Sequence, residues 1–506
     1  MSSSEKEVVL AIDQGTTGTK ALLLDGSLQV LAEASRELPQ HFPAPGEVEH
    51  DLDEIFQGLR DSVCEALEAG GVEAGAVAAI GITNQRETTA IWKAENGEPI
   101  HRAIVWQDRR TAGRCRQLKE AGLENLFREK TGLVLDPYFS GTKIAWLLDE
   151  VEDARRLADA GELRFGTIDT YLCWKLSGGT AHCTDISNAS RTLLMDLEGC
   201  RWDDQLLDSL GIPASLLPSI MDNDSIFART SGLDFLPDGI PVAGLVGDQQ
   251  SALFGQACFE AGEAKCTYGT GGFLMLNTGE KVIRSNSGLL STAAWKIGGK
   301  TTYALEGSAF IAGAVVQWLR DGLGLISGSE EIEELAASVD DCGGVVFVPA
   351  LAGLGAPHWD PEARGLVAGL TRGSTAAHIA RAALEGIAFQ INDILTAMRA
   401  DLEQEKTGTG NELLELKVDG GASNNNLLMQ FQADLLRCEV SRPSITSTTA
   451  LGAALQAGLT TGVFKSTDQI RESWGEDRRF SPAMDETEAA ANQARWEAAV
   501  RQARTS

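Results

Sequence analysis

A Gly- and Thr-rich loop joins two apolar runs near the start of the chain, in the sequence VVLAIDQGTTGTKALLL at residues 8–24. The apolar runs predict the two strands of a hairpin. Glycines let the loop turn tightly and bring its N–H groups close to an anion, and Asp13 at the end of the first strand can hold a magnesium ion through water. The pattern predicts a phosphate-binding hairpin, with an ordinary Gly/Thr turn as the alternative.

The loop does not follow the Walker A pattern GxxxxGK[ST]. Gly15 and Gly18 lie too close together, and Lys20 is followed by Ala21 rather than by serine or threonine. In P-loop enzymes a helix follows the glycines, whereas the apolar run at residues 21–24 predicts a strand here. The spacing therefore excludes a P-loop at this position.

Length and charge limit the classes of partner. The 506 residues are enough for roughly two to four domains, and 43% of them are hydrophobic. The 72 acidic and 43 basic residues give a formal net charge of −29, which argues against nucleic acid and anionic membranes as partners. No apolar run approaches the roughly 20 residues that span a bilayer, and the first residues lack a signal-peptide core. We therefore expect a cytoplasmic protein without membrane insertion.

The cysteines and histidines show no pattern typical of a metal site or a disulfide framework. The nine cysteines include no CxxC pair, and the six histidines include no HxxxH or HExxH spacing. This usage predicts reduced, buried thiols, as in a cytosolic protein, and no zinc site.

Strand-like runs alternate with helical stretches, which is typical of α/β architecture. The clearest runs lie at residues 76–82, 242–246, 345–348 and 414–418. A second strand, Gly-Thr turn and strand, EAKCTYGTGGFLMLN at residues 263–277, repeats the chemistry of the first hairpin. Two such hairpins predict two like domains, residues 1–256 and 257–506, facing each other across a cleft, with a terminal surface helix near 485–504. Independent origin of the two turns, in a chain with 54 glycines, is the alternative.

Residues 417–436, KVDGGASNNNLLMQFQADLL, predict a strand, a Gly-Gly turn and a helix. The asparagines can cap that helix, and Gly421 permits close approach to its free N–H groups. Such a helix start suits the phosphates or base of a nucleotide. A plain capped helix is the alternative.

Two further segments carry polar groups suited to a substrate that bears hydroxyls. Asp248 follows an apolar strand, where an aspartate can accept a hydroxyl proton, and its alternative role is a helix cap. Arg86 beside Glu87 supplies donors and acceptors together, as a polyol requires, and a surface ion pair is the alternative. Aromatic residues that could line a carbon chain, or simply pack in a core, are Trp106, Tyr138 and Phe273.

Taken jointly and in this order, the segments resemble the FGGY carbohydrate kinases of the actin, hexokinase and sugar-kinase superfamily, over about residues 8–462. The motifs that carry the resemblance are Asp13-Gln14-Gly15-Thr16-Thr17, Gly81-Ile82-Thr83-Asn84-Gln85-Arg86-Glu87-Thr88-Thr89, Asp136-Pro137-Tyr138-Phe139-Ser140-Gly141-Thr142-Lys143, Gly247-Asp248-Gln249-Gln250, Tyr268-Gly269-Thr270-Gly271 and Asp419-Gly420-Gly421-Ala422. The resemblance implies an α/β fold of two duplicated actin-like ATPase (ribonuclease H-like) domains facing a central cleft.

The resemblance also implies an activity, which is ATP-dependent phosphorylation of a terminal hydroxyl of glycerol to give sn-glycerol 3-phosphate, the first step of glycerol catabolism. The implied partners are glycerol, ATP and Mg²⁺, and the implied assembly is a homodimer or homotetramer. Asp248 would be the general base and, with Asp13, would position the metal. The implied acceptor-binding residues are Arg86, Glu87, Trp106, Tyr138, Asp248, Gln249 and Phe273. The implied nucleotide-binding residues are Thr16, Thr17, Gly18, Lys20, Thr270, Gly313, Gln317, Gly421 and Asn425.

Three features depart from the family pattern. Lys20 stands where many relatives have arginine, which keeps the charge but loses bidentate geometry. Residues 231–241, SGLDFLPDGIP, lack the arginine of a loop that binds a sugar bisphosphate inhibitor in some bacterial relatives. Residues 221–230 lack the histidine that is phosphorylated in other relatives. We therefore expect neither form of regulation.

Two other classes of function remain as alternatives. Another kinase of the same family could act on a pentulose, gluconate or a longer polyol, because pocket depth is not encoded in the motifs. A nucleotide-dependent binding or chaperone protein, or a catalytically silent regulator, would share the two-domain architecture. An intact Asp248, Arg86 and Glu87 argues against the binding or chaperone protein, since an ATP switch needs no polyol site, and the silent regulator stays an alternative.

Overall fold

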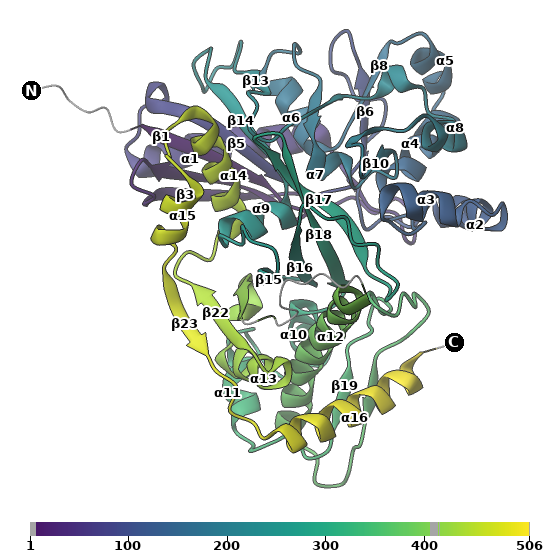
Figure 1. Ribbon diagram of the computed structural model, residues 1–506, viewed down its shortest axis with the longest axis vertical. Coiled ribbons are helices and arrows are strands. Elements are labelled where there is room, and N and C mark those ends of the chain that lie inside the picture. The colour runs from purple at the N-terminus through teal and green to yellow at the C-terminus, as the bar shows by residue number, and fades with distance from the viewer. Residues whose placement is uncertain (1–6, 405–412, 414, 505–506) are drawn as a thin grey trace, which may run out of the picture.

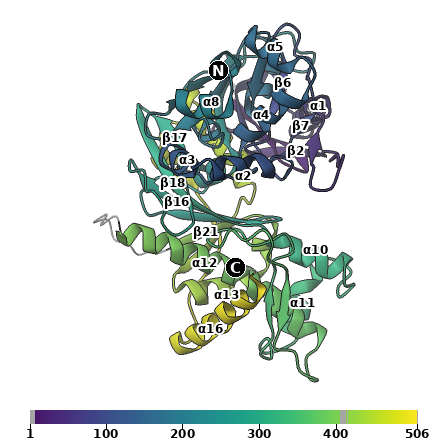
Figure 2. The ribbon, with the colours of Figure 1, turned by 90° about the vertical axis from the view of Figure 1, so that its right-hand side faces the viewer.

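The chain forms two lobes, each built around one large β-sheet (Figure 1). This computed structural model describes residues 7–404, 413 and 415–504. The first half of the chain makes most of the upper lobe, and the second half makes the lower lobe and returns to the upper one through the yellow-green segment at α14 and α15 (Figures 1 and 2). The second half of the chain therefore also contributes elements to the first lobe.

The sheet of the first lobe has six strands in the order β13-β14-β5-β1-β2-β3. Strands β1 and β2 form the predicted first hairpin and β3 extends it, all antiparallel, while β5 and β14 add on the other side of β1 in parallel. The strands are β1 (Val8–Gln14), β2 (Gly18–Asp25), β3 (Val30–Glu37), β5 (Val77–Asn84), β13 (Ala228–Arg229) and β14 (Pro241–Gly247).

The second sheet has seven strands in the order β17-β18-β16-β15-β21-β22-β23 and repeats this plan. Strands β15 and β16 form the second hairpin, β18 extends it antiparallel, and β21 and β22 add in parallel. The strands are β15 (Ala264–Tyr268), β16 (Gly272–Gly279), β17 (Leu290–Ile297), β18 (Lys300–Ala309), β21 (Glu415–Asp419), β22 (Glu439–Pro443) and β23 (Glu476–Phe480). The shared order confirms the predicted duplication.

Helices cover the sheets, and short strand pairs lie outside them. The helices are α1 (Leu52–Gly70), α2 (Ala112–Glu120), α3 (Glu124–Thr131), α4 (Ser140–Glu150), α5 (Ala154–Asp159), α6 (Ile168–Leu176), α7 (Ile186–Ala189), α8 (Asp204–Leu210), α9 (Asp248–Gly255), α10 (Gly313–Asp321), α11 (Glu331–Ala337), α12 (Ala376–Gln404), α13 (Asn426–Leu436), α14 (Thr448–Thr461), α15 (Thr467–Ser473) and α16 (Glu486–Ala503). The short strands are β4 (Glu49–His50), β6 (Ala90–Lys93), β7 (Ala103–Ile104), β8 (Leu163–Gly166), β9 (Cys183–Asp185), β10 (Met195–Asp196), β11 (Arg201–Trp202), β12 (Ser219–Met221), β19 (Val346–Val348) and β20 (Leu366–Ala368).

Strand β1 is apolar without alternation because both faces of its sheet are covered. Leu10 and Ile12 share a core with α1 and α6, whereas Val9 and Ala11 share another with α9 and α14. All four side chains are fully buried. A continuous apolar run is typical of a strand covered by helices on both faces.

Helix α14 belongs to the second half of the chain but packs against the first sheet and α9. Glycines allow backbone contact: a Cβ added at Gly452 would lie 1.9 Å from the carbonyl oxygen of Ser251, and one at Gly81 would lie 2.1 Å from that of Ala453. Real Cβ atoms do not approach so closely, so these glycines set the distance between α14 and its neighbours. Since α14 comes from the second half and packs on the first lobe, the packing does not divide the chain at residue 256. The domain division there stays a prediction.

The predicted terminal helix is present, and most of the cysteines are buried as predicted. Helix α16 lies within the predicted 485–504 region, and its Trp496 is buried and stacks on Phe389 with ring centroids 5.2 Å apart. All nine cysteines are free, but Cys64 is exposed on α1 and Cys200 is half-buried, so the prediction of buried thiols is wrong for these two. Among the described residues, no helix is long and apolar enough to span a membrane.

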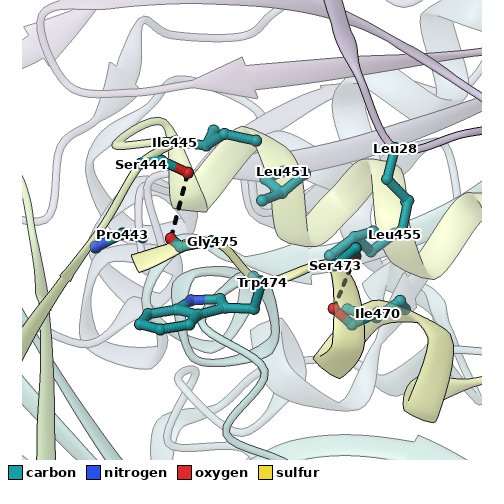
Figure 3. A pocket seen from close by; sticks show the side chains of 11 residues that line it. Leu28, Pro443, Ser444, Ile445, Leu451, Leu455, Ile470, Ser473, Trp474 and Gly475 are labelled. Carbon is teal, nitrogen blue, oxygen red and sulfur yellow. Dashed lines mark hydrogen bonds between the residues drawn. The ribbon is translucent and has the colours of Figure 1, made fainter. Parts of the chain in front are cut away.

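A small apolar cavity lies where α14 and α15 meet the first lobe (Figure 3). Its volume is about 30 Å³, and Leu455, Ile470 and Trp474 are among the side chains around it. The hydroxyl of Ser444 donates to the carbonyl oxygen of Gly475 at its edge. This volume holds only about one or two water molecules, so the cavity is too small for a substrate.

Candidate active site

The carboxyl ends of three parallel strands meet at one edge of the first sheet. Gln14 on β1 is in register with Asn84 on β5, which is in register with Gly247 on β14. Asp13 precedes this row and Asp248 follows it at the start of α9. Ligands of open α/β sheets bind at such carboxyl ends, so β1, β5 and β14 bring together residues that lie far apart in the sequence.

Arg86 follows β5 and lies between two carboxylates. Its Nε lies 3.1 Å from Oδ1 of Asp248, and its Nη1 and Nη2 donate to the two carboxylate oxygens of Glu306 at 2.6 and 2.9 Å. A Cβ at Gly247 would lie 2.7 Å from Cδ of Arg86, so this glycine leaves room for the side chain. Arg86 is only 2% exposed, which makes the alternative of a surface ion pair wrong.

Glu87 is buried next to Arg86 and has a left-handed backbone, with φ of 62°. Its Oε1 accepts a hydrogen bond of 2.6 Å from Nε of Arg191, whose Nη2 donates to Oε1 of Glu306 at 3.0 Å. Burial raises the pKa of Glu87 even though Arg191 and Arg86 oppose the shift. Burial also disfavours the charge on Glu306, but the two guanidinium groups outweigh it and lower its pKa to about 2. The site thus contains a buried network of two arginines and two glutamates.

Three aromatic rings form a wall beside this network. The rings of Trp106 and Tyr138 have centroids 5.6 Å apart, and those of Trp106 and Phe273 are 6.3 Å apart, both edge to face. Phe273 comes from β16 in the second half, whereas Trp106 and Tyr138 come from the first. Nε1 of Trp106 donates to Oγ1 of Thr16 at 2.8 Å, so the wall also touches the first Gly-Thr loop.

Gln249 has its side-chain amide oriented by a buried lysine. Nζ of Lys265 donates to Oε1 of Gln249 at 2.5 Å and to Oγ1 of Thr267 at 2.9 Å. An ammonium group only donates, so the amide presents its oxygen to Lys265 and keeps its NH₂ group for other partners. Burial lowers the pKa of Lys265.

A cavity of about 590 Å³ lies in the second lobe at the carboxyl ends of β15 and β21. Five of the predicted nucleotide-binding residues line it, namely Thr270, Gly313, Gln317, Gly421 and Asn425. Its apolar lining includes Val316, Ile332 and Leu384. A cavity of this size with glycine-lined backbone suits a nucleotide.

Two local contacts shape the polar end of this cavity, namely a helix cap and a backbone hydrogen bond. Oδ1 of Asn425 caps α13 by accepting from the N–H of Leu428 at 2.9 Å, as the sequence predicted, and this leaves its NH₂ group to donate. The backbone N–H of Gly313 donates to the carbonyl oxygen of Gly269 at 2.8 Å, which ties α10 to the second Gly-Thr loop.

The first Gly-Thr loop lies in the other lobe and does not line this cavity. A Cβ at Gly18 would lie 2.6 Å from the carbonyl oxygen of Arg36, so the loop packs tightly on β3. Nζ of Lys20 donates to Oγ of Ser447 at 2.9 Å and lies 3.6 Å from a carboxylate oxygen of Glu33. The predicted phosphate contacts of Thr16, Thr17, Gly18 and Lys20 stay predictions.

Asp13 lies near enough to Asp248 for the two charges to interact. Burial, and then the charge of Asp248, raise the pKa of Asp13 to about 7. A cation between the two carboxylates would relieve both costs, so the pair fits a magnesium ion. Within the described residues no group of three or more histidine, cysteine, aspartate or glutamate side chains could hold a metal. Phosphate oxygens and water would therefore have to complete the coordination.

Sequence reasoning missed Arg191, Lys265 and Glu306. Each is fully buried, and each contacts a predicted acceptor-site residue. A signal existed for two of them, because Lys265 is the one charged residue of β15 and Glu306 stands between the uncharged residues 301–305 and 307–312, and such charges are rarely buried unless paired. Arg191 lies in a polar stretch and had no comparable signal.

Both halves of the chain match known domains. The FGGY family of carbohydrate kinases, N-terminal domain, matches residues 8–255, and the C-terminal domain of that family matches residues 264–461. The chain belongs to the FGGY family of carbohydrate kinases. The fold of this FGGY kinase is accordingly the two-domain, actin-like fold that its motifs predicted.

Relatives with similar sequences cover this FGGY kinase almost completely. It is 56% identical to a curated protein named glycerol kinase from Myxococcus xanthus, across 98% of this chain and 99% of the relative. It is 51% identical to another of that name from Bacillus subtilis, across 98% of each chain.

Solved structures agree in fold. Plasmodium falciparum glycerol kinase with ADP has a TM-score of 0.90 and 37% identity, covering 98% of each chain. A gluconate kinase from Lactobacillus acidophilus has a TM-score of 0.85 but only 22% identity, covering 98% of this FGGY kinase and 97% of that chain, which shows the common fold alone.

Proposed function

We propose that this protein transfers the terminal phosphoryl group of ATP to a terminal hydroxyl of glycerol, giving ADP and sn-glycerol 3-phosphate, and so begins glycerol catabolism. The single observation that carries the proposal is the cluster of buried Arg86 and Glu87 with the partly exposed Asp248 beside the aromatic wall. It offers charged donors and acceptors on one side and apolar rings on the other. These match the hydroxyl groups and the carbon chain of a small polyol. Full-length similarity to proteins named glycerol kinase supports the same acceptor.

Asp248 is the proposed general base. Its Oδ1 accepts from the N–H of Gln249 at 2.7 Å and lies 3.1 Å from Nε of Arg86, so the carboxylate is held at the mouth of the site. It takes the proton of the attacking hydroxyl as the new phosphorus–oxygen bond forms. Phosphoryl transfer has a loose transition state, so positioning of the hydroxyl matters more than the strength of this base.

The other acceptor-site residues fix the orientation of the polyol. Arg86 donates to acceptor hydroxyls, Glu87 accepts from them, and the oriented NH₂ group of Gln249 donates. Trp106, Tyr138 and Phe273 cover the carbon side. Such binding holds one terminal hydroxyl against Asp248.

The nucleotide is proposed to occupy the cavity lined by Thr270, Gly313, Gln317, Gly421 and Asn425. Its outer phosphates would then extend toward Thr16, Thr17, Gly18 and Lys20 on the first hairpin. Asp13 and Asp248 would hold Mg²⁺, which when bound supplies positive charge against the phosphates. Closure of the lobes around both substrates would exclude water and limit wasteful hydrolysis of ATP.

The test measures ADP release from ATP and magnesium with glycerol, dihydroxyacetone, erythritol, xylulose or gluconate, with a control that lacks any acceptor. Strong turnover with glycerol supports the proposal. Activity only with xylulose or gluconate would replace the substrate and keep the mechanism. Silence with every acceptor would favour a catalytically silent regulator.

We also propose that the enzyme acts in the cytoplasm as a homodimer or homotetramer. The free cysteines and the acidic composition support the location, and the family resemblance supports the assembly. Light scattering coupled to size-exclusion chromatography measures the mass in solution, and a monomer would contradict the proposed assembly.

A further inference from the structure

Glu306 is a buried carboxylate that holds two arginines at once. Its Oε1 accepts from Nη2 of Arg86 at 2.9 Å and from Nη2 of Arg191 at 3.0 Å, while its Oε2 accepts from Nη1 of Arg86 at 2.6 Å. Glu306 and Arg191 are 0% exposed and Arg86 is 2% exposed. A guanidinium bound through two parallel hydrogen bonds cannot rotate freely, so Glu306 fixes the plane of Arg86.

Each arginine joins Glu306 to a residue of the proposed acceptor site. Arg86 has its Nε 3.1 Å from Oδ1 of Asp248. Arg191 donates from Nε to Oε1 of Glu87 at 2.6 Å, which directs Oε2 of that carboxylate to a different donor. The position of Glu306 therefore determines where the polar atoms of Glu87, Arg86 and Asp248 lie.

Charge balance gives Glu306 a second effect. Two buried guanidinium groups close together repel each other, and the carboxylate between them compensates. Without it, Arg86 would pair more strongly with Asp248, and a base engaged in such an ion pair accepts a proton less readily. Loss of the negative charge should thus weaken acceptor binding and slow turnover.

Glu306 comes from the second half of the chain but is bonded to residues of the first lobe. Gln250 on α9 accepts from Nη1 of Arg86 at 3.1 Å and donates to Oγ1 of Thr292 on β17 at 3.2 Å. The hydroxyls of Thr292 and Ser190 are 2.8 Å apart. These bonds attach β17 and its partner β18 to the first lobe, next to the Glu306 contacts.

We propose that Glu306 is a positioning residue that sets the affinity for the acceptor, acting through Arg86 and Arg191. It touches neither substrate, and its effect depends on a carboxylate with two accepting oxygens at this place. The inference deepens the proposed function and rests on it only in taking these residues as the acceptor site.

The test compares Glu306→Gln with Glu306→Asp in the full chain, using steady-state kinetics and any acceptor that the wild type turns over. The amide places an NH₂ group against a guanidinium, so the KM for the acceptor should rise about 100-fold while the KM for ATP stays within about twofold. Aspartate keeps the charge, so the KM for the acceptor should be at least about tenfold lower in Glu306→Asp than in Glu306→Gln.

Asp401→Asn is the matched control. Asp401 is a buried carboxylate on α12 that accepts from the hydroxyls of Ser285 and Ser287 at 2.5 and 2.8 Å, away from the acceptor site. Its replacement should leave both KM values within about twofold of the wild type. Acceptor binding by titration calorimetry repeats the comparison without turnover, so a protein with no measurable activity still gives an answer.

An unchanged acceptor affinity in folded Glu306→Gln would overturn the inference. Parallel rises in the KM for acceptor and ATP would also overturn it, since they indicate a general structural role. If Glu306→Gln does not fold, Arg191→Lys is used instead, and wild-type acceptor affinity in that variant would refute the inference. If the wild-type protein turns over another acceptor but not glycerol, the proposed function is refuted and the inference on Glu306 is not. The variants are then compared on the acceptor that the wild type uses.

Discussion

The indole N–H of Trp106 donates a hydrogen bond of 2.8 Å to the hydroxyl of Thr16. Trp106 stands in the aromatic wall of the proposed acceptor site, and Thr16 lies in the first Gly-Thr loop. One side chain therefore links the place where the polyol is expected to the place where the outer phosphates are expected. We expect this bond to couple the position of the acceptor to that of the phosphate loop.

Trp106→Phe tests this link. Phenylalanine keeps an aromatic surface but removes the donor to Thr16, so kcat/KM for glycerol should fall about tenfold with little change in stability. Steady-state kinetics measure the loss. Trp202→Phe removes a comparable indole hydrogen bond, to the carbonyl oxygen of Pro218, and should leave kcat/KM unchanged. Equal losses in both variants would contradict a specific role for the Trp106 bond.

Asp248→Asn tests the base. The amide cannot accept the hydroxyl proton, so kcat should fall by about 1,000-fold or more, while the folded protein still binds ATP. Coupled ADP release measures kcat, and calorimetry measures nucleotide binding. Asp203→Asn, at the start of α8, changes a carboxylate that caps a helix elsewhere and should retain turnover. Near-normal kcat in Asp248→Asn would exclude this residue as the base.

Asp13 should make stability depend on pH. Burial and the charge of Asp248 raise its pKa from 3.8 to about 7 in the folded protein. Between these values the folded state binds a proton that the unfolded state has lost, so the contribution of Asp13 to stability falls as the pH rises through this window. The free energy of unfolding of Asp13→Asn, relative to that of the wild type, should therefore increase by about 2 kcal/mol as the pH rises from about 5 to about 8.

Urea denaturation of wild type and Asp13→Asn at both pH values measures this difference. A magnesium ion bound between the carboxylates favours the ionised form, so Mg²⁺ with ATP should reduce the gain of the variant at the higher pH. The same difference in stability at both pH values would show that Asp13 does not titrate in this range.

Gly452→Ala should destabilise the protein by about 3 kcal/mol or more, because the new Cβ would collide with backbone and push α14 from α9. The added atom would lie 1.9 Å from the carbonyl oxygen of Ser251. Gly75→Ala is the control, since no atom lies within 4 Å of a Cβ built there. Thermal and urea unfolding measure both variants. A stable Gly452→Ala would mean that α14 can move away at low cost.

The sequence by itself determined the local elements and the family. The sequence predicts both Gly-Thr hairpins, the strands at β5, β14 and β21 and an asparagine cap on α13. Hairpins, caps and motif spacing depend on neighbouring residues, and these appear directly in the order of the chain. Duplication of the two sheets followed from the same local repeats.

Only the tertiary structure decided how the acceptor site is supported. Glu306 lies 220 residues from Arg86, and Lys265 on β15 reaches Gln249 on α9, so their pairing depends on how β15 and β18 dock on the first lobe. The return of α14 to the first sheet likewise depends on glycine contacts between distant segments. Buried charges choose partners by distance and geometry in the folded chain, and such long-range packing has no local signature in the sequence.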